Sequence, residues 1–103
     1  MIAVMIEGAR GHSAMATIHF TTHLMRHREV RALQAPGAVL AEVLDRAFAD
    51  DPMLKAYVLD EQGRVRKHVQ VYLDGAPIRD RLRLTDPVAP ASEIYVMQAL
   101  SGG

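Results

Sequence analysis

The 103-residue sequence contains no cysteine and no tryptophan, and only two of its twelve basic residues are lysines, Lys55 and Lys67. The absence of cysteine excludes disulfide bonds, thiolate metal ligands and a cysteine nucleophile within the chain. Any sulfur chemistry must therefore be carried by a group other than a thiol side chain. The two lysines are the only side-chain amines to which another protein could be joined through an isopeptide bond.

The sequence also lacks an excess of charge of either sign and a long apolar run. Twelve basic residues balance twelve acidic ones, so nothing indicates electrostatic attraction to nucleic acid or to an anionic membrane. No segment approaches the roughly 20 apolar residues of a membrane span. Residues 1–6 are apolar but are followed by Glu7 and lack the basic region of a signal peptide. We expect one globular domain in the cytoplasm.

Residues 1–14 have two interpretations. Ile2, Val4 and Ile6 alternate with other residues as in a short strand, which would make this segment a real extension with an extra edge strand. Alternatively, translation begins at Met15 and the first fourteen residues are not part of the native protein. The sequence leaves both open.

The segment after Met15 is expected to form a hairpin. Residues 16–21 are rich in β-branched and aromatic side chains and alternate as in a strand. Residues 24–27 are the expected turn, and residues 28–34 the second arm, with Val30 and Ala32 pointing inward.

Residues 35–37, Ala-Pro-Gly, are expected to break this pattern before a helix over residues 38–50. Its apolar residues recur at helical spacing and form one stripe: Val39, Leu40, Val43, Leu44, Ala47 and Phe48. Proline disfavours helix in the preceding residue, so the helix should end at Asp51-Pro52. Residues 53–59 are apolar but irregular and are expected to form a short helical turn.

The second half of the sequence alternates again. Residues 69–73 predict a strand, Asp74-Gly75 a tight turn, Ile78 the start of a short arm, and residues 93–99 the last strand. One main helix among hairpins, in the order β-β-α-β-β-β, predicts an α+β domain with the helix on one face of a sheet.

Ser101-Gly102-Gly103 follows the last strand directly. Two residues without Cβ are costly to order and bury nothing, so residues 101–103 are expected to form a flexible tail. Such a tail presents its carboxylate without hindrance and fits a slot too narrow for side chains. A free carboxylate is a poor electrophile and needs activation by ATP. The chain has no phosphate-binding glycine loop, so a separate enzyme must perform that step.

Residues 69–79, 86–88 and 93–103 together resemble the ubiquitin-like sulfur carriers, the family that includes the small subunit of molybdopterin synthase and the thiamin sulfur carrier. The Asp-Gly turn, the last strand and the Gly-Gly end occur at the family's spacing, and the match covers roughly residues 16–103. The resemblance implies a β-grasp domain over residues 15–100, with a mixed sheet of four to five strands. It also implies that the first and last strands lie parallel in the sheet centre.

The function that this resemblance implies is that of a carrier and not of an enzyme. Gly103, preceded by Gly102, would be adenylated by an enzyme of the ubiquitin-activating type and converted to a thiocarboxylate. A biosynthetic enzyme would then accept the sulfur, for molybdopterin, thiamin thiazole, cysteine or another thio-metabolite. No cofactor is expected on the chain itself, and the ATP is used by the activating enzyme.

Two alternatives stay open. A ubiquitin-like modifier would have the same fold and activation, but Gly103 would be joined to lysine amines. A plain binding module would carry its Gly-Gly end by chance.

The last strand is the expected docking element for partner enzymes. Tyr95 and Met97 share one strand face, and Ile94 and Val96 the other. We predict partner binding through Tyr95, Met97, Leu100 and Ser101. The alternative, in which the large apolar residues among them pack within the domain, stays open.

Three histidines, His19, His23 and His27, are spaced by four. On a helix this spacing would favour a Zn²⁺ site, but the surrounding residues predict strand and turn. We therefore expect no metal site.

The remaining charged residues are expected to be ordinary surface groups. Arg79, Arg81 and Arg83 alternate along the chain and could bind an anion or an acidic patch of the activating enzyme. We favour a solvated edge that discourages aggregation, and extend this interpretation to Arg64, Arg66 and Lys67. The acidic pairs 50–51 and 60–61 are expected to cap turns.

Overall fold

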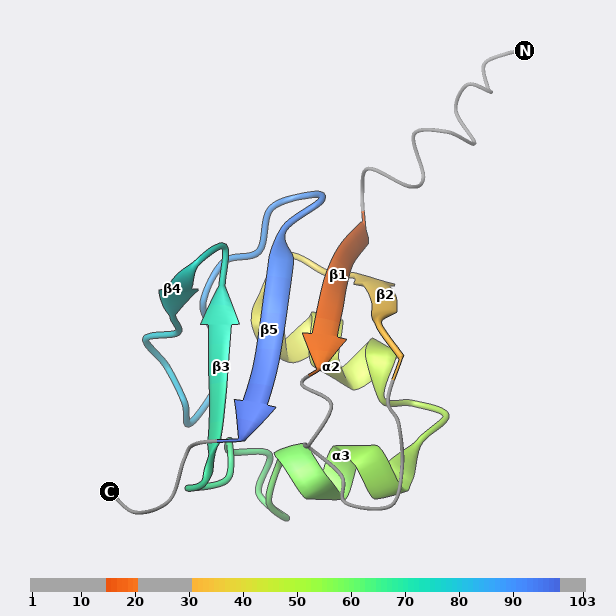
Figure 1. Cartoon of the computed structure of the whole chain (residues 1–103), viewed down its shortest axis with the longest axis vertical. Helices are drawn as coiled ribbons and strands as arrows, with labels where there is room; N and C mark the ends of the chain where they lie inside the picture. Colours follow the sequence, from red (N-terminus) through yellow and green to blue (C-terminus); the bar gives the residue numbers. More distant parts are fainter. Residues whose placement is uncertain (1–14, 21–30, 99–103) are drawn as a thin grey trace, which may run out of the picture.

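The computed structural model describes residues 15–20 and 31–98. Their strands form one five-stranded sheet in the order β2-β1-β5-β3-β4, and both helices lie on one side of it (Figure 1). Residues 1–14 and the predicted turn 24–27 lie outside the described residues. The α+β architecture and the order of elements are those of the predicted β-grasp, with a second short helix after the first.

The sheet is mixed, with its parallel pair in the middle. β1 (Met15–Phe20) runs parallel to β5 (Glu93–Gln98). β2 (Leu33–Pro36) flanks β1, and β3 (Val69–Leu73) flanks β5, both antiparallel. β4 (Ala76–Pro77) forms the other edge. A parallel pair needs a long crossover connection, and the helices lie in the segment between β1 and β5 that provides it.

The two helices are α2 (Leu40–Ala47) and α3 (Pro52–Val58). Asp51 caps α3, since its Oδ1 accepts a hydrogen bond from the amide of Leu54 at 3.1 Å. Pro52 has no amide hydrogen to be capped and is well tolerated at the first helical position. Asp51-Pro52 therefore begins α3 as well as separating it from α2. The short helical turn predicted over residues 53–59 is thus confirmed.

The core fills the space between the helices and the inner sheet face. Buried apolar side chains from every strand except β4, from both helices and from the connecting loops form one cluster. Its largest fully buried members are Phe48, Ile18, Leu40, Leu44, Leu54 and Ile94. Each fully buried leucine or isoleucine contributes about 1.5–3 kcal/mol to stability. This cluster therefore holds the helices against the sheet.

The second strand was predicted too early in the chain. The expected break at residues 35–37 begins inside β2, where Ala35 is buried and Pro36 pairs with Met15. Pro36 is tolerated there because β2 is an edge strand, where a missing amide donor costs little. Ala32 is exposed, contrary to its predicted inward direction, and Val30 lies outside the described residues.

Two further boundaries differ from the predictions. The main helix is shorter than residues 38–50, because residues 48–50 form a turn. The short arm expected to start at Ile78 is β4, which ends one residue earlier, and Ile78 itself is buried. The tight turn at Asp74-Gly75 is confirmed: φ is 50° and 90° at these residues, the pair of positive values that hairpin turns of this kind require.

Candidate functional site

The last strand has one buried and one outward face, as predicted. Ile94 and Val96 are fully buried, whereas Tyr95 is 43% exposed and Met97 is partly buried. The prediction that Tyr95 lies on the face opposite Ile94 is confirmed, and the exposed side chain of Tyr95 is accessible to a partner. Met97 lies on the same face with less of its surface accessible.

Tyr95 lies at the centre of a row of side chains that crosses the outward face. His19 on β1 and Tyr72 on β3 are its register partners on either side. The His19 and Tyr95 rings stack with centroids 4.5 Å apart and planes inclined by 16°. Stacked aromatic rings hold each other in place, so the row presents a preformed aromatic surface.

His19 also contacts the carboxylate at the start of β5. Its Nε2 lies 2.5 Å from Oε1 of Glu93, and both side chains are partly exposed. The histidine is therefore a member of the outward face. Among residues 15–20 and 31–98, no group of three or more possible ligands could hold a metal ion. His23 and His27 lie outside the described residues.

The start of β5 is fixed by the turn between β3 and β4. Asp74 Oδ2 accepts a hydrogen bond from Ser92 Oγ, and Asp74 Oδ1 accepts one from the amide of Glu93, both at 2.8 Å. The amide of Asp74 in turn donates to the carbonyl of Glu93 at 2.8 Å. These reciprocal bonds hold the strand that leads to the Gly-Gly segment.

The far end of β5 lies beside the beginning of β3, where Gln98 pairs with Val69. The five remaining residues of the sequence follow Gln98 directly. Leu100, Ser101, Gly102 and Gly103, the other predicted site residues, lie outside the described residues. The structure therefore fixes Gln98, the point from which the remaining residues depart, and the beginning of β3 borders that point.

The three alternating arginines are not equivalent. Arg81 is half-buried, and its Nη2 donates to the carbonyls of Arg66 at 2.8 Å and Val69 at 2.7 Å. The prediction of a uniformly solvated edge is therefore wrong for Arg81, which ties the segment after β4 to the beginning of β3. Arg79 and Arg83 are exposed, as expected.

Two aspartates shape the same segment. The carboxylate of Asp86 accepts hydrogen bonds from the amides of Arg79 and Asp80. The carboxylate of Asp80 accepts hydrogen bonds from the amides of Leu82 and Arg83. The hydrogen bond from the Thr85 hydroxyl, followed by the amide bonds, lowers the pKa of Asp80 from 3.8 to about 2. A carboxylate that accepts several hydrogen bonds is stabilised in its charged form. This segment is thus held by internal capping.

The carboxylate predicted to cap the turn after α3 does so. Asp60 accepts hydrogen bonds from the amides of Gln62 at 2.8 Å and Arg64 at 3.0 Å. It also forms an ion pair with Arg64 Nε at 2.9 Å. The amide bond from Arg64 is the main cause that lowers the pKa of Asp60.

The sequence reasoning missed the role of His19, Tyr72 and Glu93 beside Tyr95. Their proximity depends on strand register, which joins residues more than 70 positions apart in the case of His19 and Glu93. The alternation of β1 and β3 was the only available signal, and it identifies faces without identifying neighbours.

No helix in residues 15–20 and 31–98 has the length and apolar character needed to cross a membrane.

Comparison with known proteins identifies relatives by structure only. No protein-family model and no curated protein sequence matches the chain. SAMP1 from Haloferax volcanii matches with a TM-score of 0.69 at 20% identity, over 86% of this chain and 99% of that chain. A chain of the BexX/CysO complex of Amycolatopsis orientalis matches with a TM-score of 0.70 at 22% identity, over 85% and 99%. Urm1 from Trypanosoma brucei matches with a TM-score of 0.58 at 15% identity, over 87% and 96%.

These similarities establish the ubiquitin-like β-grasp fold. These matches are all below 25% identity, so they show the fold and assign no role to this chain.

Proposed function

We propose that the chain is a sulfur carrier whose C-terminal Gly103 is converted to a thiocarboxylate. The observation that carries this proposal is the course of β5. This central strand presents Tyr95 outward, and its described part ends at Gln98, five residues before Gly103. A partner that docks on the outward face thus lies next to the departure point of a segment small enough to enter a narrow active site.

The chemistry requires an activating enzyme and a sulfur donor. A carboxylate oxygen of Gly103 attacks the α-phosphorus of ATP, which releases pyrophosphate and leaves an acyl-adenylate. Hydrosulfide attacks the carbonyl carbon, and AMP departs as the leaving group. One oxygen is thereby replaced by sulfur, and the thiocarboxylate later delivers that sulfur to a biosynthetic enzyme. Since the chain has no cysteine, the backbone terminus is the group that can carry the sulfur.

Molybdopterin synthesis is one pathway that this carrier would serve, since the resemblance includes the small subunit of molybdopterin synthase. The structural similarity to CysO and Urm1 supports a carrier in the broader sense. We propose that ATP is bound only by the activating enzyme and that the protein acts in the cytoplasm.

The test is the intact mass of the protein purified from its own host, before and after treatment with a reagent that alkylates thiocarboxylates. We expect a species heavier by the replacement of one oxygen by sulfur, with the alkyl group mapped to Gly103. Only unmodified carboxylate, under conditions where the host's own sulfur-carrier pathways are active, would contradict the proposal. The same spectrum identifies the terminal residue of the mature chain.

A second candidate is a protein modifier joined through Gly103 to lysine amines. The specific observation in its favour is the structural match to a protein named as a small archaeal modifier. The two functions share the acyl-adenylate and differ in the nucleophile, sulfide or amine. Gly-Gly remnants on lysines of other host proteins after proteolysis would support the modifier function, and they are compatible with a thiocarboxylate on the free protein.

A further inference from the structure

A basic pocket lies beside the departure point of the tail. It has a volume of about 630 Å³, within the range of ordinary ligand sites. We call it the cationic pocket; its basic lining residues are Arg64, Arg66, Lys67, His68 and Arg81, with Asp60 as the single acidic residue. In a chain with equal numbers of acidic and basic residues, this is a local concentration of positive charge.

Three positive charges of the cationic pocket have no carboxylate partner within the described segments. The ion pair with Asp60 neutralises Arg64. Arg66 instead donates from Nε to the carbonyl of Ala56 at 2.6 Å, and Arg81 donates to two backbone carbonyls. Backbone carbonyls are neutral, so these bonds fix the guanidinium groups and leave their charges uncompensated. Lys67 is exposed and makes no hydrogen bond or ion pair in the described part of the chain.

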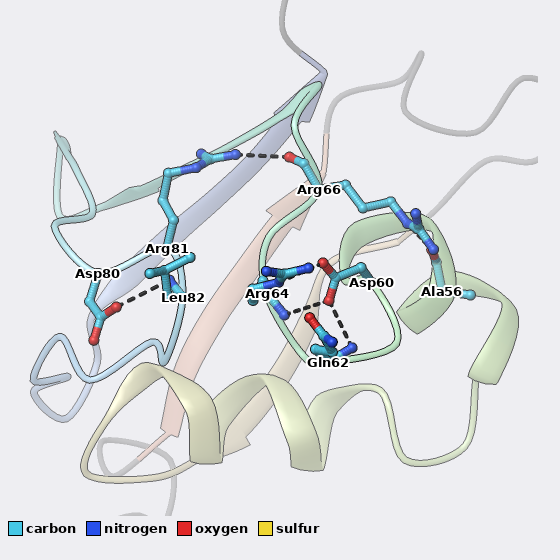
Figure 2. A network of polar contacts seen from close by, with 8 residues as sticks. All are labelled: Ala56, Asp60, Gln62, Arg64, Arg66, Asp80, Arg81 and Leu82. Carbon is cyan, nitrogen blue, oxygen red and sulfur yellow. Dashed lines mark hydrogen bonds and ion pairs between the residues drawn. The ribbon is translucent and has the colours of Figure 1, made fainter.

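The two fixed arginines do not converge on one point. Figure 2 shows Arg66 reaching toward α3 and Arg81 reaching toward the backbone of Arg66. A guanidinium has five N–H donors in a planar fork, and each of these groups uses only one nitrogen in the bonds described. A single phosphate is bound best by donors that meet around it. Separated cations suit an extended ligand with several carboxylates.

An apolar side chain adjoins these charges. Leu82 lines the cationic pocket and also a neighbouring depression bounded by α2, and it is 64% exposed. Protein–protein interfaces combine arginine with apolar contacts, whereas a small anion would gain nothing from Leu82.

The position of the cationic pocket connects it with the tail. His68 and Lys67 immediately precede Val69, the register partner of Gln98 in β5. A partner segment in the pocket would therefore lie next to residues that lead to Gly103.

We propose that the cationic pocket binds an acidic, leucine-containing segment of a protein partner. The identification of that partner as an enzyme that takes the tail rests on the proposed carrier function. Carboxylates of the segment would meet Arg66, Lys67 and Arg81, and its leucine would contact Leu82. Complementary charges of this kind chiefly raise association rates and select partners.

The experiment is an NMR titration of the full ¹⁵N-labelled chain with an acetylated hexapeptide, Glu-Glu-Asp-Leu-Glu-Asp. We expect amide shifts in residues 64–70 and 81–82 that weaken with added salt. The neutral peptide with Gln and Asn in place of the acids should produce none of them. Shifts confined to other surfaces, or no shifts at the highest soluble peptide concentration, would overturn the proposal.

Charge reversal at one site provides the specificity control. Lys67→Glu should weaken peptide binding roughly fivefold or more, because an attraction becomes a repulsion. Arg31→Glu makes the same change in net charge beside β2, at the opposite edge of the sheet from β4, and should leave the affinity within about twofold. Equal losses in both variants would mean that only the overall charge matters, which overturns the proposal. Both positions are exposed, so neither change should disturb folding.

A third arm uses inorganic pyrophosphate as the probe. Pyrophosphate binding that depends on Lys67, without peptide binding, would assign the pocket to phosphate compounds and overturn the protein-segment proposal. The mass measurement on Gly103 is independent of these titrations. A thiocarboxylate without peptide binding removes only the pocket proposal, and peptide binding without a thiocarboxylate removes only the carrier function.

Discussion

At the scale of single residues, hydrogen bonds to aspartates shape the loops that surround the sheet. Asp74, Asp80 and Asp86 each accept amides from segments that have no regular secondary structure or lie at the end of a strand. Amides in loops lack the partners that helices and sheets supply. The side-chain carboxylates provide those partners, so the loops have defined conformations without extra core.

Asp80 makes this contribution measurable through pH. Its pKa is lowered to about 2 in the folded protein from 3.8, with the Thr85 hydrogen bond as the main cause. A lowered folded pKa stabilises the folded state above the unfolded value, and the stabilisation disappears as pH falls through the folded value. We expect the urea midpoint of the wild type to fall between about pH 4 and about pH 2 more steeply than that of Asp80→Asn. Asp50→Asn, at an exposed turn position, should retain the wild-type slope. Identical acid limbs for wild type and Asp80→Asn would contradict this assignment.

At the scale of secondary-structure elements, Arg81 joins the segment after β4 to the start of β3. Arg81→Met keeps most of the aliphatic stem but removes the donors to the carbonyls of Arg66 and Val69. We expect a loss of about 2 kcal/mol in the free energy of unfolding, the size typical of hydrogen bonds with a charged partner. Arg79→Met is the matched control and should stay within about 0.5 kcal/mol. Chemical denaturation measures both, and equal effects would show that Arg81 has no special structural role.

Local patterns in the sequence predicted several features of these elements. Alternation correctly placed Tyr95 on one face of the strand and Ile94 and Val96 on the other, because side-chain direction in a strand follows from period two alone. The helical stripe from Leu40 to Phe48 and the Asp74-Gly75 turn were equally local signals.

Interactions between distant segments were not predictable in this way. Arg79 and Arg81 have the same local pattern, yet only Arg81 meets carbonyls from a segment more than ten residues away. The inclusion of Pro36 in β2 depends on its position at the sheet edge, and the neighbours of Tyr95 depend on register. Both are properties of the assembled sheet.

At the scale of the whole molecule, the residues that form the core and the residue proposed to react lie in different parts of the chain. Among the described residues, the members of the hydrophobic core lie between Ala16 and Val96, and the described sheet ends at Gln98. If the proposed carrier function holds, the β-grasp domain would thus be stable whatever group its terminus carries.

Deletion of Gly102-Gly103 tests this separation. We expect the melting temperature to stay within about 2 °C of the wild type, since surface changes away from core and caps alter stability by at most about 0.5 kcal/mol. Thiocarboxylate formation should be abolished, because the new terminal carboxylate, on Ser101, lies two residues short of the position that the activating enzyme would adenylate. Replacement of Gly102-Gly103 by Ala-Ala is the matched control for length: it keeps the terminal carboxylate at position 103, but its methyl groups would obstruct a narrow slot, so it should also lose the sulfur. Differential scanning calorimetry and intact mass on the same preparations measure the two properties.

A large fall in melting temperature on deletion would mean that the last two residues belong to the folded domain and not to a reactive tail. Undiminished thio-modification of the Ala-Ala variant would show that the activating enzyme does not require glycine at these positions.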